Sequence, residues 1–124
     1  MSLALANVTK RYPAGVEALR GVSVEIADGD QVAVVGPSGS GKTTMLTILG
    51  TLERPTSGEV TVAGYDAVAA SDTQLAGLRA CRIGFVFQSF HLQDSMSALE
   101  NVASGMLYTG VRASDRRAAA QTAL

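Results

Sequence analysis

The chain has 124 residues, of which 47% are apolar and 17% are charged, so it is long enough for one folded domain and too apolar to be disordered. Ten basic and eleven acidic residues leave a net charge of −1, which gives no field that attracts nucleic acid. The single cysteine, Cys81, and the single histidine, His91, provide neither a disulfide framework nor a zinc ligand set, and we expect Cys81 to be a small buried residue.

The sequence contains no continuous apolar run long enough to span a bilayer, and its start is not typical of a signal peptide. It therefore predicts a cytoplasmic chain that reaches a membrane only through a partner.

The N-terminal quarter of the chain predicts antiparallel strands. Apolar residues alternate with polar ones over residues 3–9, with an irregularity near Asn7, and alternate again over residues 22–26. Pro13 and Gly15 predict a loop over residues 12–17, and a turn is expected at Asp28-Gly29.

The next segments predict a strand, a loop and a helix in succession. Gln31–Val35 carries four successive apolar residues, which indicate a strand buried on both faces. A glycine-dense loop follows over residues 36–41, and after it helical spacing joins Met45, Ile48, Leu49 and Leu52. Residues 59–63 alternate again, with Val60 and Val62 on one face.

The C-terminal half predicts three helices and one strand. Asp72 is expected to cap a helix that reaches Ala80, and Ile83–Phe87 is a second continuous apolar strand. After the irregular residues 89–97, apolar residues from Leu99 to Leu107 predict an amphipathic helix closed by Gly110, and Ser114 is expected to cap a last helix. This order of elements predicts an α/β fold with an antiparallel N-terminal portion and a helical C-terminal portion.

The glycine-dense loop has the composition of a phosphate-binding loop. It satisfies the pattern G-x-x-x-x-G-K-[ST] between a predicted strand and a predicted helix, through Gly36, Pro37, Ser38, Gly39, Ser40, Gly41, Lys42 and Thr43. Glycine lets the backbone curl so that its N–H groups surround a phosphate, and a helix start adds further N–H groups and the positive end of the helix dipole.

Three side chains complete this predicted site. Lys42 supplies a positive charge for the β- and γ-phosphates of ATP, and the Thr43 hydroxyl is placed to ligate Mg²⁺. Thr44, one position further along, can donate to a more distal phosphate. A phosphate loop alone could equally belong to a kinase, a GTPase or a helicase.

The residues around the loop resemble the ABC transporter ATPases. The resemblance covers essentially the whole chain and rests on residues 36–58 (GPSGSGKTTMLTILGTLERPTSG), Val8–Tyr12, Ala18–Ser23, Asp28–Asp30, Ile83–Phe90 and Ala98–Val102. The residues from Leu75 to IGFVFQ are most similar to the branch that includes lipoprotein-releasing, macrolide-export and antimicrobial-peptide-export ATPases.

The resemblance implies a P-loop NTPase fold of the ABC ATPase type, with an ATP-binding core over residues 1–88 and the beginning of a helical subdomain over residues 89–124. It implies ATP and Mg²⁺ as cofactors, transmembrane permease subunits and a second ATPase subunit as partners, and no nucleic acid. It also implies a location on the cytoplasmic face of the cell membrane, where ATP hydrolysis is coupled to substrate export or lipoprotein release.

Individual roles follow from the same resemblance. Tyr12 matches the position whose ring stacks on adenine, and an aromatic face suits a purine. Gln88 matches the Q-loop glutamine, which in the family contacts Mg²⁺ and the attacking water, so Lys42 and Gln88 are the catalytic candidates. Permease docking is implied for a segment that includes Phe90, Leu92, Met96 and Leu99, although Leu99 fits a core position equally well.

The 124 residues contain neither the family's signature loop nor an apolar strand that ends in Asp-Glu, and His91 is in the wrong place for the switch histidine. We therefore expect this stretch to be the N-terminal part of such an ATPase, with weak nucleotide binding and hydrolysis near background, because no water-activating group is present. The alternatives are a non-catalytic nucleotide-binding module and a P-loop small-molecule kinase, which Tyr12 and the Q-loop segment disfavour.

Overall fold

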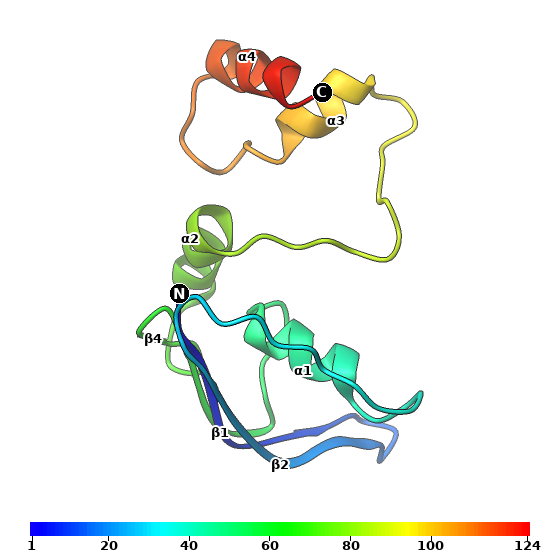
Figure 1. Cartoon of the computed structure of the whole chain (residues 1–124), viewed down its shortest axis with the longest axis vertical. Coiled ribbons are helices and arrows are strands. Elements are labelled where there is room, and N and C mark those ends of the chain that lie inside the picture. The colour runs from blue at the N-terminus through cyan, green and yellow to red at the C-terminus, as the bar shows by residue number, and fades with distance from the viewer. The chain divides into compact units, whose positions relative to one another are not determined.

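The computed structural model describes all 124 residues, and the chain divides into two compact units, Met1–Leu75 and Ala76–Leu124. The first unit contains the sheet, the phosphate loop and one complete helix, the helix over residues 72–82 spans the boundary, and the second unit contains the two C-terminal helices (Figure 1). The domain boundary that we expect after residue 88 stays a prediction.

Four strands form one antiparallel sheet in the first unit. They are β1 (Leu3–Arg11), β2 (Glu17–Ile26), β3 (Ser57–Val62) and β4 (Tyr65–Asp66), in the spatial order β2-β1-β3-β4. The antiparallel N-terminal portion predicted from alternation is therefore confirmed. The two-residue strand β4 was not predicted from the sequence.

The chain forms four helices: α1 (Lys42–Leu49), α2 (Asp72–Arg82), α3 (Ala98–Ser104) and α4 (Ala113–Ala123). In the first unit α1 contacts β1, β2 and β3, and in the second unit α3 packs against α4. No helix of the chain is both long enough and apolar enough to cross a lipid bilayer.

A bulge in β1 lets that strand contribute two core residues at an odd spacing. Leu5 and Val8 are both buried, although regular alternation would direct residues three apart to opposite faces. The pairing with β2 shifts register between them, and Asn7 has φ 50° while its N–H donates to Ser23 Oγ at 2.9 Å. This is the irregularity predicted near Asn7, and it is confirmed.

The core of the first unit joins one face of the sheet to α1. Its buried residues from the sheet and from α1 are Leu5, Val8, Leu19, Ile48, Leu49, Val60 and Val62. Full burial of a Val, Leu or Ile side chain contributes about 1.5–3 kcal/mol to the free energy of folding. Together these side chains hold α1, and hence the loop before it, against the sheet. Leu52, predicted on the same helical stripe, lies beyond the end of α1 and is exposed, because the helix ends at Leu49 with Gly50 as its C-cap.

The two continuous apolar strands predicted over Gln31–Val35 and Ile83–Phe87 are wrong. Neither segment pairs with a strand, and both are largely exposed, with Val35 86% and Val86 103% exposed. A strand exists only where a neighbour accepts its backbone hydrogen bonds. Apolar composition indicates that such a segment favours burial, but it does not identify a neighbouring strand that would accept its backbone hydrogen bonds.

Three smaller predictions in the C-terminal half are also wrong. Cys81 is exposed because each step of three residues turns the side chain back by about 60°, which carries Cys81 away from the buried Leu75 and Leu78. The helix predicted from Leu99 to Leu107 ends at Ser104, whose hydroxyl donates to Asn101 O at 2.7 Å. The last helix begins at Ala113 after Arg112, so Ser114 lies inside it.

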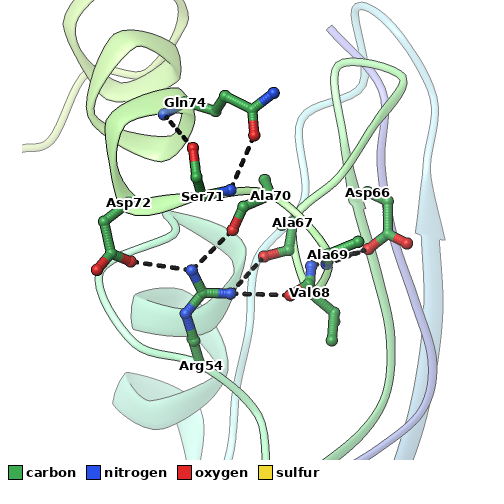
Figure 2. A network of polar contacts seen from close by, with 9 residues as sticks. All are labelled: Arg54, Asp66, Ala67, Val68, Ala69, Ala70, Ser71, Asp72 and Gln74. Carbon is green, nitrogen blue, oxygen red and sulfur yellow. Dashed lines mark hydrogen bonds and ion pairs between the residues drawn. The ribbon is translucent and has the colours of Figure 1, made fainter.

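The segment that leads into α2 is held by one arginine, Arg54, from the connection between α1 and β3 (Figure 2). Arg54 Nη1 donates to Val68 O at 2.8 Å, and Nη2 donates to Ala70 O and Asp72 Oδ1 at 2.8 and 2.9 Å. Asp66 Oδ1 accepts the N–H groups of Val68 and Ala69 in the same turn. These bonds replace the ladder partners that an irregular segment lacks.

Ser71, and not Asp72, caps α2 (Figure 2). Gln74 N donates to Ser71 Oγ at 3.3 Å while Ser71 N donates to Gln74 Oε1 at 2.8 Å, so the two residues form a reciprocal capping box. The Asp72 carboxylate is instead paired with Arg54. The predicted cap is therefore wrong by one residue.

Replacing Ser71 by alanine is expected to destabilise the chain by about 1 kcal/mol, the typical cost of losing such a cap. Thermal unfolding followed by circular dichroism measures it. Thr73→Ala is the matched control, because Thr73 is exposed and its side chain makes no hydrogen bond. Equal midpoints for the two variants would contradict a capping role.

Candidate functional site

The phosphate loop is placed directly before α1, as the sequence predicts. α1 begins at Lys42, and Gly41 is the residue before it, with φ 86° and no side chain to cap the helix. The first turn contains no acidic residue. An uncapped helix start without negative charge leaves N–H groups and the positive end of the dipole available to an anion.

The loop amides are open in the same way. Ser40 N–H donates to Pro37 O at 3.3 Å, which closes a turn within the loop. The N–H groups of Gly39, Gly41 and Lys42 donate to no acceptor in the chain. Several donors in one short curved segment form a concave anion-binding surface of the kind seen in phosphate loops.

Lys42 lies over this loop. Its Nζ donates to Gly36 O at 2.8 Å and to Pro37 O at 2.7 Å, and Ser40 Oγ lies 3.4 Å away. The two carbonyl groups position the ammonium beside the open amides, so its charge and the amide dipoles act on the same place. This arrangement has the chemistry required to bind a polyphosphate.

A cavity of about 260 Å³ adjoins the loop, and its lining is partly polar and partly apolar. Its lining combines the loop residues Gly36, Pro37, Ser40, Gly41 and Lys42 with the apolar residues Leu19, Val22, Val34, Val35 and Met45. The apolar wall offers no hydrogen-bond donor, so the donors that line this cavity are those on the loop and the first turn of α1.

Tyr12 follows β1 and lies beside α1. Its hydroxyl donates to Glu53 Oε2 at 2.9 Å and lies 3.4 Å from Thr44 Oγ1. Lys10 Nζ pairs with Glu53 Oε1 at 2.9 Å and lies 5.2 Å from the centroid of the Tyr12 ring. Thr47 Oγ1 also reaches Glu53 Oε2, at 3.4 Å. We call these five residues, Lys10, Tyr12, Thr44, Thr47 and Glu53, the Glu53 cluster.

Glu53 was not predicted from the sequence as a functional residue. The hydrogen bond from Lys10 lowers the pKa of Glu53, burial opposes this shift, and the hydrogen bond from Tyr12 adds to the lowering. Along the sequence, Glu53 lies 43 residues from Lys10 and 41 residues from Tyr12. No local pattern announces contacts over such separations.

Thr43 suits the predicted Mg²⁺ contact. It lies exposed in the first turn of α1, and its hydroxyl makes no hydrogen bond within the chain, so the oxygen is available to a cation held beside the phosphates. No group of three or more His, Cys, Asp or Glu side chains forms a separate metal site. A single hydroxyl ligand from the protein suits Mg²⁺, because this cation takes most of its other ligands from substrate phosphates and water.

Gln88 and the expected partner-binding residues belong to the second unit. Gln88 is exposed, and so are Phe90 and Leu92, at 89% and 65%. Met96 and Leu99 instead line an apolar groove between α3 and α4. The roles of Gln88 toward Mg²⁺ and of this segment toward a permease stay predictions.

Comparison with known proteins identifies the family. The model of the ABC transporter family matches residues 19–124. An uncharacterised ABC transporter ATP-binding protein of Thermotoga maritima is 49% identical over 123 residues, which cover 97% of this chain and 53% of that protein. The lipoprotein-releasing system ATP-binding protein LolD of Geobacter metallireducens is 45% identical and is covered over 56% of its length.

Two further comparisons agree. The macrolide export ATP-binding/permease protein MacB of Chromobacterium violaceum is 45% identical over 98% of this chain, which covers 19% of that protein. The dimeric post-hydrolysis structure of the ATP-binding cassette MJ0796 bound to ADP and Pi superimposes with a TM-score of 0.86 at 40% identity, over 97% of this chain and 54% of that one.

The chain thus spans about half the length of the Thermotoga maritima and Geobacter metallireducens relatives, with coverages of 53% and 56%. The matches confirm both the predicted family and the predicted ABC ATPase-type fold. From its phosphate loop, its antiparallel sheet and these relatives, the chain belongs to the ABC transporter family, as part of an ATP-binding cassette.

Proposed function

We propose that this chain binds Mg·ATP through residues 36–44 and forms part of the ATP-binding subunit of an export-type transporter. One observation supports this most directly. The Lys42 ammonium lies over a loop whose amides have no acceptor in the chain, at the uncapped start of α1. Each of these donors serves an anion with several oxygen atoms, and ATP is the anion that the family binds.

Separate roles follow for the polar side chains of the loop. Lys42 neutralises charge on the β- and γ-phosphates, and the Thr43 hydroxyl holds Mg²⁺, which when bound withdraws charge from the phosphate oxygens. Thr44 lies one residue further along the first turn, and its hydroxyl is near Tyr12 Oη. Gln88 is the residue proposed to contact Mg²⁺ and to orient the attacking water.

The proposal for the whole protein extends further. It acts as a dimer of ATPase subunits on the cytoplasmic face of a membrane and couples hydrolysis to export or to lipoprotein release through permease subunits. Relatives named for lipoprotein release, macrolide export and pyoverdine export support this, as does the dimeric cassette MJ0796. Exposed Phe90 and Leu92 support a partner surface in the second unit.

Isothermal titration of the folded chain with Mg·ATP tests the proposal. We expect saturable binding, and we expect Lys42→Ala to weaken it by about 10- to 100-fold, because charge-assisted hydrogen bonds are worth about 1.5–3 kcal/mol each. Arg20→Ala is the matched control, since Arg20 is an exposed cation on β2. No heat of binding at millimolar Mg·ATP, or equal binding by Lys42→Ala, would refute the proposed function.

A further inference from the structure

Contacts of both its backbone and its hydroxyl hold the Tyr12 side chain in place. The Tyr12 backbone closes its own loop, where Tyr12 N donates to Val16 O and Gly15 N donates to Tyr12 O, both at 2.9 Å. The side chain extends from there toward α1, where its hydroxyl lies near Thr44 and donates to Glu53 in the segment after the helix. A tyrosine with two separate anchors has little freedom to reorient, so its ring has a defined position at the phosphate-binding helix.

Glu53 is the common partner of the side chains around Tyr12. Its Oε2 accepts from Tyr12 and Thr47, and its Oε1 pairs with Lys10. Lys10 Nζ also donates to Arg54 O at 2.8 Å, so the ammonium is fixed from two sides. One carboxylate therefore sets the position of the tyrosine hydroxyl and of the cation beside the ring.

The cation occupies one face of the Tyr12 ring. Lys10 Nζ lies over the ring, 5.2 Å from its centroid, and is mostly buried, with its side chain 15% exposed. An aromatic ring has two faces, so the face away from Lys10 is the one on which a planar base can stack. The Glu53 contacts thereby also select which face of Tyr12 is presented.

We propose that Glu53 is a positioning residue for base recognition: its carboxylate fixes Tyr12 and Lys10 so that the ring face away from Lys10 stacks on the adenine of a nucleotide whose phosphates lie at the loop. This inference rests on the proposed function. Glu53 does not touch the phosphates in this role, so its effect should depend on the base of the ligand and not on its phosphate chain.

Two ligands separate this role from a general structural one. Mg·ATP carries the base, and magnesium tripolyphosphate carries the phosphate chain without base or sugar. We expect Glu53→Ala to raise the Kd for Mg·ATP by about tenfold, a part of what one stacked base contributes, and to leave the Kd for magnesium tripolyphosphate within about twofold of wild type. Glu53→Gln should be intermediate, because its amide oxygen still accepts from Tyr12 while the ion pair with Lys10 is lost.

Two further variants complete the test. In a Tyr12→Ala background, adding Glu53→Ala should change the Kd for Mg·ATP by less than about twofold, because the residue that Glu53 positions is already absent. Glu59→Ala is the matched control, since Glu59 is an exposed glutamate on β3 whose side chain makes no hydrogen bond. Circular dichroism of each variant verifies that the sheet is formed.

The outcomes are distinct. A selective loss of Mg·ATP affinity that vanishes in the Tyr12→Ala background supports the role of Glu53. Equal weakening of both ligands, unchanged Mg·ATP affinity, or an undiminished effect without Tyr12 would overturn it while leaving the proposed phosphate site intact. If Glu53→Ala fails to fold, the comparison of Glu53→Gln with wild type decides by the same criterion. A wild-type chain that binds neither ligand would overturn the proposed function and this inference together.

Discussion

Replacing Gly58 by alanine is expected to destabilise the first unit by about 3 kcal/mol or more. Gly58 has φ +95°, which costs an L-residue about 1–2 kcal/mol. A Cβ at this position would also lie 2.6 Å from Asn7 O and 2.7 Å from Val8 Cα, so β1 would have to move at its bulge. Overpacking of this kind adds about 1–3 kcal/mol.

Urea or thermal unfolding followed by circular dichroism measures the loss. Gly64→Ala is the matched control, because Gly64 has a similar φ of +81° but no atom within 4 Å of a built Cβ. The difference between the two variants isolates the contact with β1 from the backbone conformation. A Gly58→Ala protein no less stable than Gly64→Ala would show that β1 yields easily there, against the close packing described above.

Gly41→Ala is expected to lower the affinity for Mg·ATP by about 100-fold. Gly41 has φ +86°, and a Cβ there would lie 2.4 Å from Ala18 O, a backbone atom of β2. Since β2 is held in the sheet, the start of α1 must shift instead. Loss of two charge-assisted hydrogen bonds to the phosphates, at about 1.5 kcal/mol each, lowers the affinity by about 100-fold.

Titration with Mg·ATP measures the loss, with circular dichroism to confirm that α1 and the sheet remain formed. Gly21→Ala is the control, because Gly21 in β2 has φ +82° and open space around a built Cβ. It should reduce stability without a comparable change in affinity. A folded Gly41→Ala protein that binds Mg·ATP as tightly as wild type would place the phosphates somewhere other than at the start of α1.

The local features of the first unit were predictable from the sequence because each is set by short-range chemistry. Alternation located β1, β2 and β3, and the spacing of glycines before Lys42 located the start of α1. The spacing of Leu5 and Val8 also indicated an irregularity near Asn7, where the pairing of β1 with β2 shifts register. Periodicity, glycine and a positive charge act within a few residues, so the sequence displays them directly.

Features that depend on distant residues were not predictable in the same way. The apolar composition of Val32–Val35 and Ile83–Phe87 indicated strands, but pairing depends on a neighbour whose identity no local pattern gives. The same reason explains why Glu53 was missed, since its partners Lys10 and Tyr12 lie in β1 and in the loop after it. The prediction of the α2 cap was wrong by only one residue. Ser71 and Gln74 have the capping-box spacing, but the adjacent Asp72 is also a favourable cap residue.

The exposed segment Gln31–Val35 has a consequence for the behaviour of the chain in solution. It contains no charged residue and no proline, three of its five residues are valine, and its backbone groups are not engaged by any strand. An exposed apolar segment with free backbone groups is a template for strand pairing, either with another polypeptide or with a second copy. Self-association through this segment should compete with folding as protein concentration rises, so dilute samples free of oligomers give the nucleotide affinities that belong to the monomer.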